Sequence, residues 1–204
     1  RTALPLQNYG GSGAPDRVLA LQDRPGESPP VRPLWVYTSS LPAGEVSYDQ
    51  YSSALVDAYN DDLLDVVFSD SRGVVHALKG TNGHELWTYA TNHAIESGPT
   101  VADLLGDGKQ EIVVVTDCNK ALANCPGRTD DGALYVFAAY SLTKNLISAI
   151  TFPYKLDSAG PVIAGRDPTD GSGRQAILLG TWGGFLKCTL ISVAFLGSCL
   201  PTRI

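Results

Sequence analysis

Four cysteines are the side chains whose spacing points most directly to chemistry, and they fall into two local groups, Cys118 with Cys125 and Cys188 with Cys199. Zinc sites of the finger type need cysteines only about two to four residues apart, and neither gap is that short. We therefore expect two short-range disulfides. These would place the chain in an oxidising compartment, which means extracellular, cell-surface or periplasmic. The alternative is four buried free thiols in a reducing compartment.

Histidines and the common catalytic motifs give no active site. The three histidines show no paired spacing of the kind that metal sites or proton-transfer sites use: His76, His84 and His93. The sequence also contains no Gly-x-Ser-x-Gly motif, phosphate-binding loop or dinucleotide fingerprint. We predict that the chain is not an enzyme and has no catalytic or cofactor-binding residues. The tryptophans are predicted to pack between structural units: Trp35, Trp87 and Trp182. If Trp182 is exposed, it is a candidate contact residue instead.

Composition fits a single all-β domain. The chain has 204 residues, of which 44% are hydrophobic, and its 21 glycines and 13 prolines are typical of a protein with many turns. The net charge is −6, and the Lys and Arg residues are scattered, which argues against nucleic acid as a ligand. No apolar run is long enough to span a membrane. The chain begins at Arg1 and contains no Met, as expected for a processed mature chain or a fragment.

Three segments share one layout, which predicts the fold. In each, a short apolar strand leads into an acidic loop, and a β-branched strand, a turn and two further strands follow. Asp57 and Asp103, which open the first two loops, are 46 residues apart. A period of about 40–50 residues with four short strands is typical of a β-propeller, in which each four-stranded sheet is called a blade. No segment keeps the periodicity of a helix.

The repeat predicts about three and a half blades. The half-blade of two outer strands rests on residues 34–37, Leu-Trp-Val-Tyr, which match residues 86–89, Leu-Trp-Thr-Tyr. The Pro-rich segment from Asp23 to Pro33 is expected to be a loop, and Asn82-Gly83 is expected to form a hairpin turn. The predicted divisions are an N-terminal extension at 1–16, a half-blade at 17–40, a blade at 41–95, a blade with a disulfide-bearing insertion at 96–156, and a blade with a C-terminal tail at 157–204.

Two family resemblances accompany the repeat. The segment from Pro99 to Glu111, which contains Asp-Leu-Leu-Gly-Asp-Gly, resembles the FG-GAP repeat of integrin-type propellers. The segment from Val75 to Trp87 resembles the PQQ-like (quinoprotein-type) propeller repeat, whose Gly turn and Trp dock neighbouring blades. Such propellers include enzymes, receptors and scaffolds, so the resemblance implies a fold rather than an activity.

The FG-GAP resemblance implies calcium ligands at the first, third, fifth and ninth positions of each acidic loop. The third positions, Tyr59 and Leu105, do not fit. Because calcium needs about six to eight oxygens, the favoured interpretation is that the carboxylates accept backbone N–H groups in turns, and calcium is the one cofactor left open. Acidic residues stand at the other three positions: Asp57, Asp61 and Asp65 in the first loop, and Asp103, Asp107 and Glu111 in the second.

Counting blades leads to the predicted function. A propeller that does not close leaves strand edges unpaired, so we expect the chain to be incomplete without a partner or the rest of a larger chain. The predicted function is a non-enzymatic secreted or cell-surface module that mediates adhesion or assembly. Its open edges would bind a protein partner or copies of itself, and repeated addition would build a filament. A glycan is a further candidate ligand. The alternative is a fragment of a quinoprotein-like or carbohydrate-active propeller enzyme.

Overall fold

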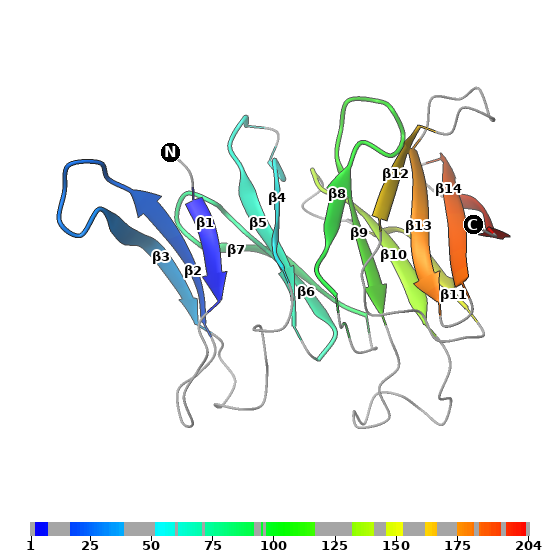
Figure 1. The fold of residues 1–204 in the computed structure, drawn as a ribbon, viewed down its shortest axis with the longest axis horizontal. Helices are drawn as coiled ribbons and strands as arrows, with labels where there is room; N and C mark the ends of the chain where they lie inside the picture. The colour runs from blue at the N-terminus through cyan, green and yellow to red at the C-terminus, as the bar shows by residue number, and fades with distance from the viewer. Residues whose placement is uncertain are drawn as a thin grey trace.

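The computed structural model describes residues 3–7, 17–38, 52–59, 61–70, 72–91, 95, 97–116, 132–140, 146–152, 162–166, 175–181, 184–192 and 195–202. All regular secondary structure within these ranges is β-strand, arranged as four antiparallel sheets. Figure 1 shows the sheets side by side in chain order, as the blades of a propeller are arranged. The predicted all-β propeller fold is therefore confirmed.

Three of the sheets have four strands each, and in each sheet the strand order follows the chain. The second sheet contains β4 (Ala54–Val56), β5 (Asp65–Ser69), β6 (Val74–Leu78) and β7 (Glu85–Ala90). The third contains β8 (Thr100–Ala102), β9 (Glu111–Thr116), β10 (Ala133–Ala138) and β11 (Leu146–Thr151). The fourth contains β12 (Val162–Arg166), β13 (Gln175–Thr181), β14 (Gly184–Ser192) and β15 (Phe195–Thr202).

The first sheet has three strands, which corrects the predicted boundaries. It contains β1 (Ala3–Gln7), β2 (Arg17–Asp23) and β3 (Val31–Thr38). β1 lies in the segment predicted as an N-terminal extension, so the predicted pair of strands is a set of three. β3 also begins inside the segment predicted as a loop. Pro33 pairs with Leu21 next to a register shift, and such an irregularity accommodates a residue that cannot donate a backbone hydrogen bond.

The first sheet matches the last three strands of the second sheet in register. Trp35 lies opposite Ala20, as Trp87 lies opposite Ala77. On the other side of β2, Leu4 of β1 pairs with Leu21, just as Val66 of β5 pairs with Leu78 of β6. β1, β2 and β3 therefore correspond to β5, β6 and β7. Among the described residues, no strand occupies the place along β1 that β4 occupies along β5.

The sheets pack face to face, which explains why the middle strands are apolar on both sides. β5, β9 and β10 are buried along their whole length, because each faces a neighbouring sheet on both sides. Separate apolar clusters fill the interfaces. One, between the first and second sheets, contains Trp35 and Phe68; the next, between the second and third, contains Trp87 and Phe137. A third joins the third and fourth sheets through Ile177 and Leu179.

The hairpin turn predicted at Asn82-Gly83 docks the first sheet on the second. Gly83 has φ of 73°, and its N–H donates to the carbonyl of Lys79 at 2.7 Å. A Cβ atom on Gly83 would lie 2.7 Å from the ring of Trp35, so only glycine allows this approach. The indole Nε1 of Trp35 donates to the carbonyl of Gly80 at 2.8 Å. Trp35 and Trp87 thus pack between sheets as predicted, whereas Trp182 lies outside the described residues.

Candidate functional site: the acidic loops and the intersheet groove

The first acidic loop, which joins β4 to β5, is held together by its carboxylates. Asp57 accepts hydrogen bonds from the backbone N–H groups of Asp61 and Asp62, at 3.0 and 2.9 Å. Asp61 accepts from the N–H of Leu63 at 3.1 Å. These bonds satisfy backbone donors that a tight turn would otherwise leave unpaired.

The second acidic loop, between β8 and β9, is held by the same kind of hydrogen bond from backbone to carboxylate. Asp103 accepts from Gly106 at 2.7 Å, from Asp107 at 3.1 Å and from Gly108 at 2.9 Å. Asp107 accepts from the N–H of Lys109 at 3.0 Å. In both loops, therefore, the first acidic residue accepts hydrogen bonds from backbone N–H groups across the turn.

The last acidic residue of each loop is buried beneath it. Asp65 accepts from the N–H of Gly80 at 2.8 Å and from that of Ala58 at 3.2 Å. Burial raises its pKa, and these two hydrogen bonds partly offset the rise. Glu111 is fully buried and accepts from the N–H of Leu104 at 2.8 Å. Burial raises the pKa of Glu111 to about 7, while the nearby N–H groups of Leu104 and Leu105 act in the opposite direction.

The described part of the chain brings no three metal-ligating side chains together at one point. Asp57, Asp61 and Asp103 accept hydrogen bonds from backbone N–H groups, as carboxylates that cap turns do. One oxygen of Glu111 has no hydrogen-bond partner among the described residues, and Glu111 belongs to no group of three or more metal-ligating side chains there. Calcium binding thus rests on the sequence of the loops alone.

The two cysteine groups differ in what the structure describes. Cys188 and Cys199 are directly opposite each other on the neighbouring antiparallel strands β14 and β15. Opposed residues on such strands have Cα atoms about 4.5–5.5 Å apart, which is within the range that a disulfide spans. Cys118 and Cys125 lie outside the described residues. The register is compatible with the predicted Cys188–Cys199 disulfide, and both disulfides remain predictions.

A polar cluster that the sequence did not indicate lies between the first two sheets. Nε2 of His76 is 3.2 Å from a carboxylate oxygen of Asp70. The imidazole ring of His76 stacks on the ring of Phe68, with 4.9 Å between the two ring centroids. Glu85 lies 3.8 Å from Nδ1 of His76 and accepts a hydrogen bond from the hydroxyl of Tyr37 at 3.2 Å. Since Tyr37 comes from β3 and the others from the second sheet, the cluster joins the two sheets. Of the other histidines, His84 is exposed and His93 lies outside the described residues.

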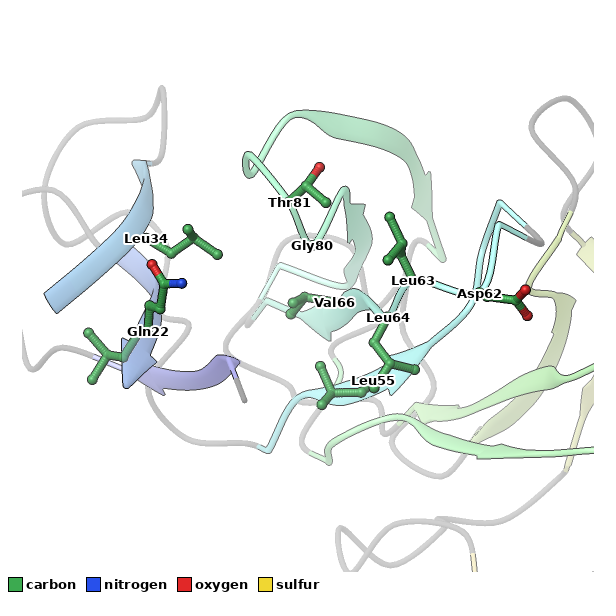
Figure 2. A pocket seen from close by; sticks show the side chains of 10 residues that line it. Gln22, Leu34, Leu55, Asp62, Leu63, Leu64, Val66, Gly80 and Thr81 are labelled. Atoms are coloured by element: carbon green, nitrogen blue, oxygen red, sulfur yellow. The ribbon is translucent and has the colours of Figure 1, made fainter. Parts of the chain in front are cut away.

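An apolar groove opens between the first and second sheets, at the end where the first acidic loop lies. Its volume is about 530 Å³. Figure 2 shows Gln22 and Leu34 of the first sheet on one side and Leu63 and Leu64 of the acidic loop on the other, with Val66 between them. We call this cavity the intersheet groove. Its aliphatic lining consists of Leu21, Leu34, Leu55, Leu63, Leu64 and Val66.

The groove exposes leucines that a soluble protein normally buries. Leu34 is 41% exposed, Leu63 47% and Leu64 58%. The close approach of the β6–β7 turn fixes the loop, because a Cβ atom on Gly80 would overlap the carbonyl of Leu64. The sequence offered one signal of this surface, which is the pair of adjacent leucines inside an otherwise acidic loop.

The chain matches no family model, and no curated protein matches it. Among solved structures, it is similar to the exotype rhamnogalacturonan lyase YesX, with a TM-score of 0.48 and 14% identity, covering 96% of this chain and 36% of that chain. It is also similar to BamB from Moraxella catarrhalis, with a TM-score of 0.36 and 14% identity, covering 97% of this chain and 63% of that chain. The chain thus spans less than two thirds of either protein.

Proposed function

We propose that this chain is a non-enzymatic module that mediates adhesion or assembly by binding protein at its first sheet. The observation that carries the proposal is the apolar surface beside that sheet. The intersheet groove, which lies between the first and second sheets, exposes Leu63 and Leu64. Exposed apolar side chains favour association with another polypeptide.

The polar side chains of the second sheet support a structural role for its interface with the first. His76 and Asp70 contact each other inside the interface, and Asp70 also accepts from the N–H groups of Arg72 and Val74, at 3.0 and 2.9 Å. Asp65 is occupied by two backbone donors. These side chains stabilise turns and link neighbouring strands, which is the role expected of polar groups in a structural scaffold.

We further propose that the module works outside the cytoplasm, in an extracellular, cell-surface or periplasmic setting. The opposed positions of Cys188 and Cys199 on β14 and β15 support this, because a disulfide there would persist only in an oxidising compartment. Among the described residues, no helix is long and apolar enough to cross a membrane.

Light scattering after size-exclusion chromatography tests association. Over a concentration series the average mass should rise above that of the monomer. The double variant L63K/L64Q, which gives the first acidic loop the residues that the second carries as Lys109 and Gln110, should remain monomeric. A well-folded wild-type chain that stays monomeric at every concentration would overturn assembly through this surface.

A further inference from the structure

The turn that docks the first sheet on the second contains the only Asn-Gly pair of the sequence, Asn82-Gly83. In such a pair the backbone nitrogen of the glycine can attack the side-chain amide carbon of the asparagine, because no Cβ atom on the glycine hinders the approach. Asn82 is exposed, so water reaches its side chain. The pair therefore has the chemistry for spontaneous loss of the side-chain amide, which is called deamidation.

Deamidation at this pair consumes water and releases ammonia. The nitrogen of Gly83 forms a bond to Cγ of Asn82, the bond from Cγ to the amide nitrogen breaks, and ammonia leaves with the proton that Gly83 gives up. The product is a succinimide ring that joins the two residues. Water then opens the ring at one of its two carbonyls. One opening gives aspartate, and the other gives isoaspartate, in which the main chain is longer by the Cβ methylene group.

The folded turn opposes this reaction. Gly83 donates its N–H to the carbonyl of Lys79 at 2.7 Å, and the side-chain oxygen of Asn82 accepts from the N–H of His84 at 3.0 Å. The first bond engages the proton that Gly83 must lose, and the second restricts the rotation of the Asn82 side chain. The reaction should therefore proceed mainly from states in which the turn has opened.

Trp35 of the first sheet holds the turn closed. Its indole Nε1 donates to the carbonyl of Gly80, inside the turn, at 2.8 Å. Its ring lies directly against Gly83, where a Cβ atom would be 2.7 Å from it. Both contacts depend on docking of the first sheet on the second, so docking and protection of the Asn-Gly pair are linked.

We propose that Asn82 is a deamidation site that the docked first sheet protects, and that its isoaspartate product releases this sheet. The added methylene group displaces Gly83 from Lys79, so the hydrogen bond that shapes the turn is lost and the surface on which Trp35 packs changes. Aspartate keeps the turn instead, because a carboxylate oxygen can accept from His84 as the amide oxygen does.

The modification also reaches the intersheet groove. Gly80 and Thr81, which belong to the same turn, are among the residues that line the groove. Isoaspartate at Asn82 therefore alters this surface together with the docking of the first sheet. Because the Cβ methylene group stays in the main chain, the change is permanent, and it limits how long the chain keeps the groove in its original form.

The rate is measured by peptide mapping with mass spectrometry during incubation in mildly alkaline buffer. The reference is a peptide with the sequence of residues 78–86, which lacks the rest of the fold. Asn82 in the full chain should react on the order of a hundredfold more slowly than in the peptide. Trp35→Phe keeps aromatic packing but loses the bond to Gly80, so its rate should be about tenfold higher than that of the wild type.

Trp87→Phe is the matched control for Trp35→Phe. Trp87 occupies the same register position in the second sheet but packs in the cluster with Phe137 of the third, so this variant should react as the wild type does. A full chain that reacts as fast as the peptide would overturn the inference. Equal rates for Trp35→Phe and the wild type would do the same, because docking would then give no protection.

The consequence is measured on the isoaspartate form, isolated after long incubation and identified by enzymatic methylation of isoaspartate. Its backbone amides in β3 should exchange hydrogen faster than those of the unmodified chain, and its Trp fluorescence should shift. Asn82→Asp, which has the same charge without the added methylene group, should behave as the wild type. Unchanged exchange in the isoaspartate form would overturn release of the sheet. Equally fast exchange in Asn82→Asp would assign the effect to charge and overturn it as well.

Discussion

The indole Nε1 of Trp35 lies 2.8 Å from the carbonyl oxygen of Gly80, whereas Nε1 of the corresponding Trp87 is buried with no hydrogen-bond acceptor among the described residues. The two tryptophans occupy the same register position on β3 and β7, so they offer a matched comparison. Trp35 holds the first sheet against the second by packing and a hydrogen bond, whereas Trp87 holds the second sheet against the third by packing alone.

Replacement of each tryptophan by phenylalanine should separate these contributions. Trp35→Phe leaves the Gly80 carbonyl without its donor, whereas Trp87→Phe removes an unpaired buried donor. We expect Trp35→Phe to lower the free energy of unfolding by about 1–2 kcal/mol more than Trp87→Phe does. Urea denaturation of both variants checks this. Equal losses would show that the hydrogen bond contributes nothing.

Gly83 and Gly108 provide a second matched pair, because both have positive φ, 73° and 83°, but only Gly83 faces another side chain. Gly108→Ala should cost about 1 kcal/mol of backbone strain. Gly83→Ala should cost about 2–4 kcal/mol, because the new methyl group also displaces the ring of Trp35. Urea midpoints measure both losses, and a shift in Trp fluorescence should accompany only the change at Gly83. Similar losses for both variants would contradict the docking of Trp35 on this turn.

Glu111 should make stability depend on pH. Its pKa is raised from 4.5 to about 7 in the folded chain, so the folded state binds the proton more tightly than the unfolded state. The contribution of Glu111 to stability should therefore be greatest below pH 4.5 and should fall as the pH rises to about 7, by up to roughly 3 kcal/mol. Asp65, whose pKa is also raised, contributes in the same direction.

Glu111→Gln isolates that contribution. The amide oxygen can still accept from Leu104, but the side chain no longer titrates, so the difference in unfolding free energy between wild type and variant should change between pH 4.5 and 7. Glu27→Gln, at an exposed side chain, is the control for the change from carboxylate to amide. A flat difference for Glu111→Gln would mean that burial does not raise the pKa of its carboxyl.

Replacement of Asp103 tests whether the second acidic loop binds calcium. In Asp103→Asn one of the two accepting oxygens is replaced by an amide nitrogen, so at least one backbone hydrogen bond across the loop is lost. We expect a loss of about 1 kcal/mol that is the same in EDTA and in about 1 mM calcium. Thermal denaturation in both solutions measures this. A loss that appears only with calcium would show instead that the loop binds the metal.

The predicted disulfides are tested by alkylation followed by mass spectrometry. The four cysteines should react only after reduction. Cys199→Ser should destabilise the chain by about 2–3 kcal/mol, since the disulfide to Cys188 would close a short loop. Reaction of all four thiols without reductant would contradict both the disulfides and the proposed compartment.

Local signals in the sequence predicted much of the fold. The Asn82-Gly83 turn and the β-branched strands around Val66 and Ile112 form as expected, because each depends on neighbouring residues. β1 was missed because Pro5 interrupts its pattern and its partner strand lies further along the chain. The strand through Pro33 was missed because a register shift accommodates the proline, and the sequence carries no sign of that shift.

The candidate site was less predictable because it depends on distant contacts. The carboxylates of Asp57 and Asp103 act within their own loops, so their turn-capping role follows from the sequence. The exposure of Leu63 and Leu64 depends instead on how the first sheet packs beside the loop, which a repeat pattern does not show. The contact of His76 with Asp70 and Glu85 likewise required knowledge of which strands are adjacent.

In the first acidic loop, the bonds that set its shape come from Asp57 and Asp61, while the side chains of Leu63 and Leu64 face the groove. Shape and surface chemistry are thus encoded by different residues. Mutations at the two leucines can change the surface chemistry of the loop without altering the path of its backbone. The surface of each unit in such a tandem array can therefore vary on its own, while its neighbours keep theirs.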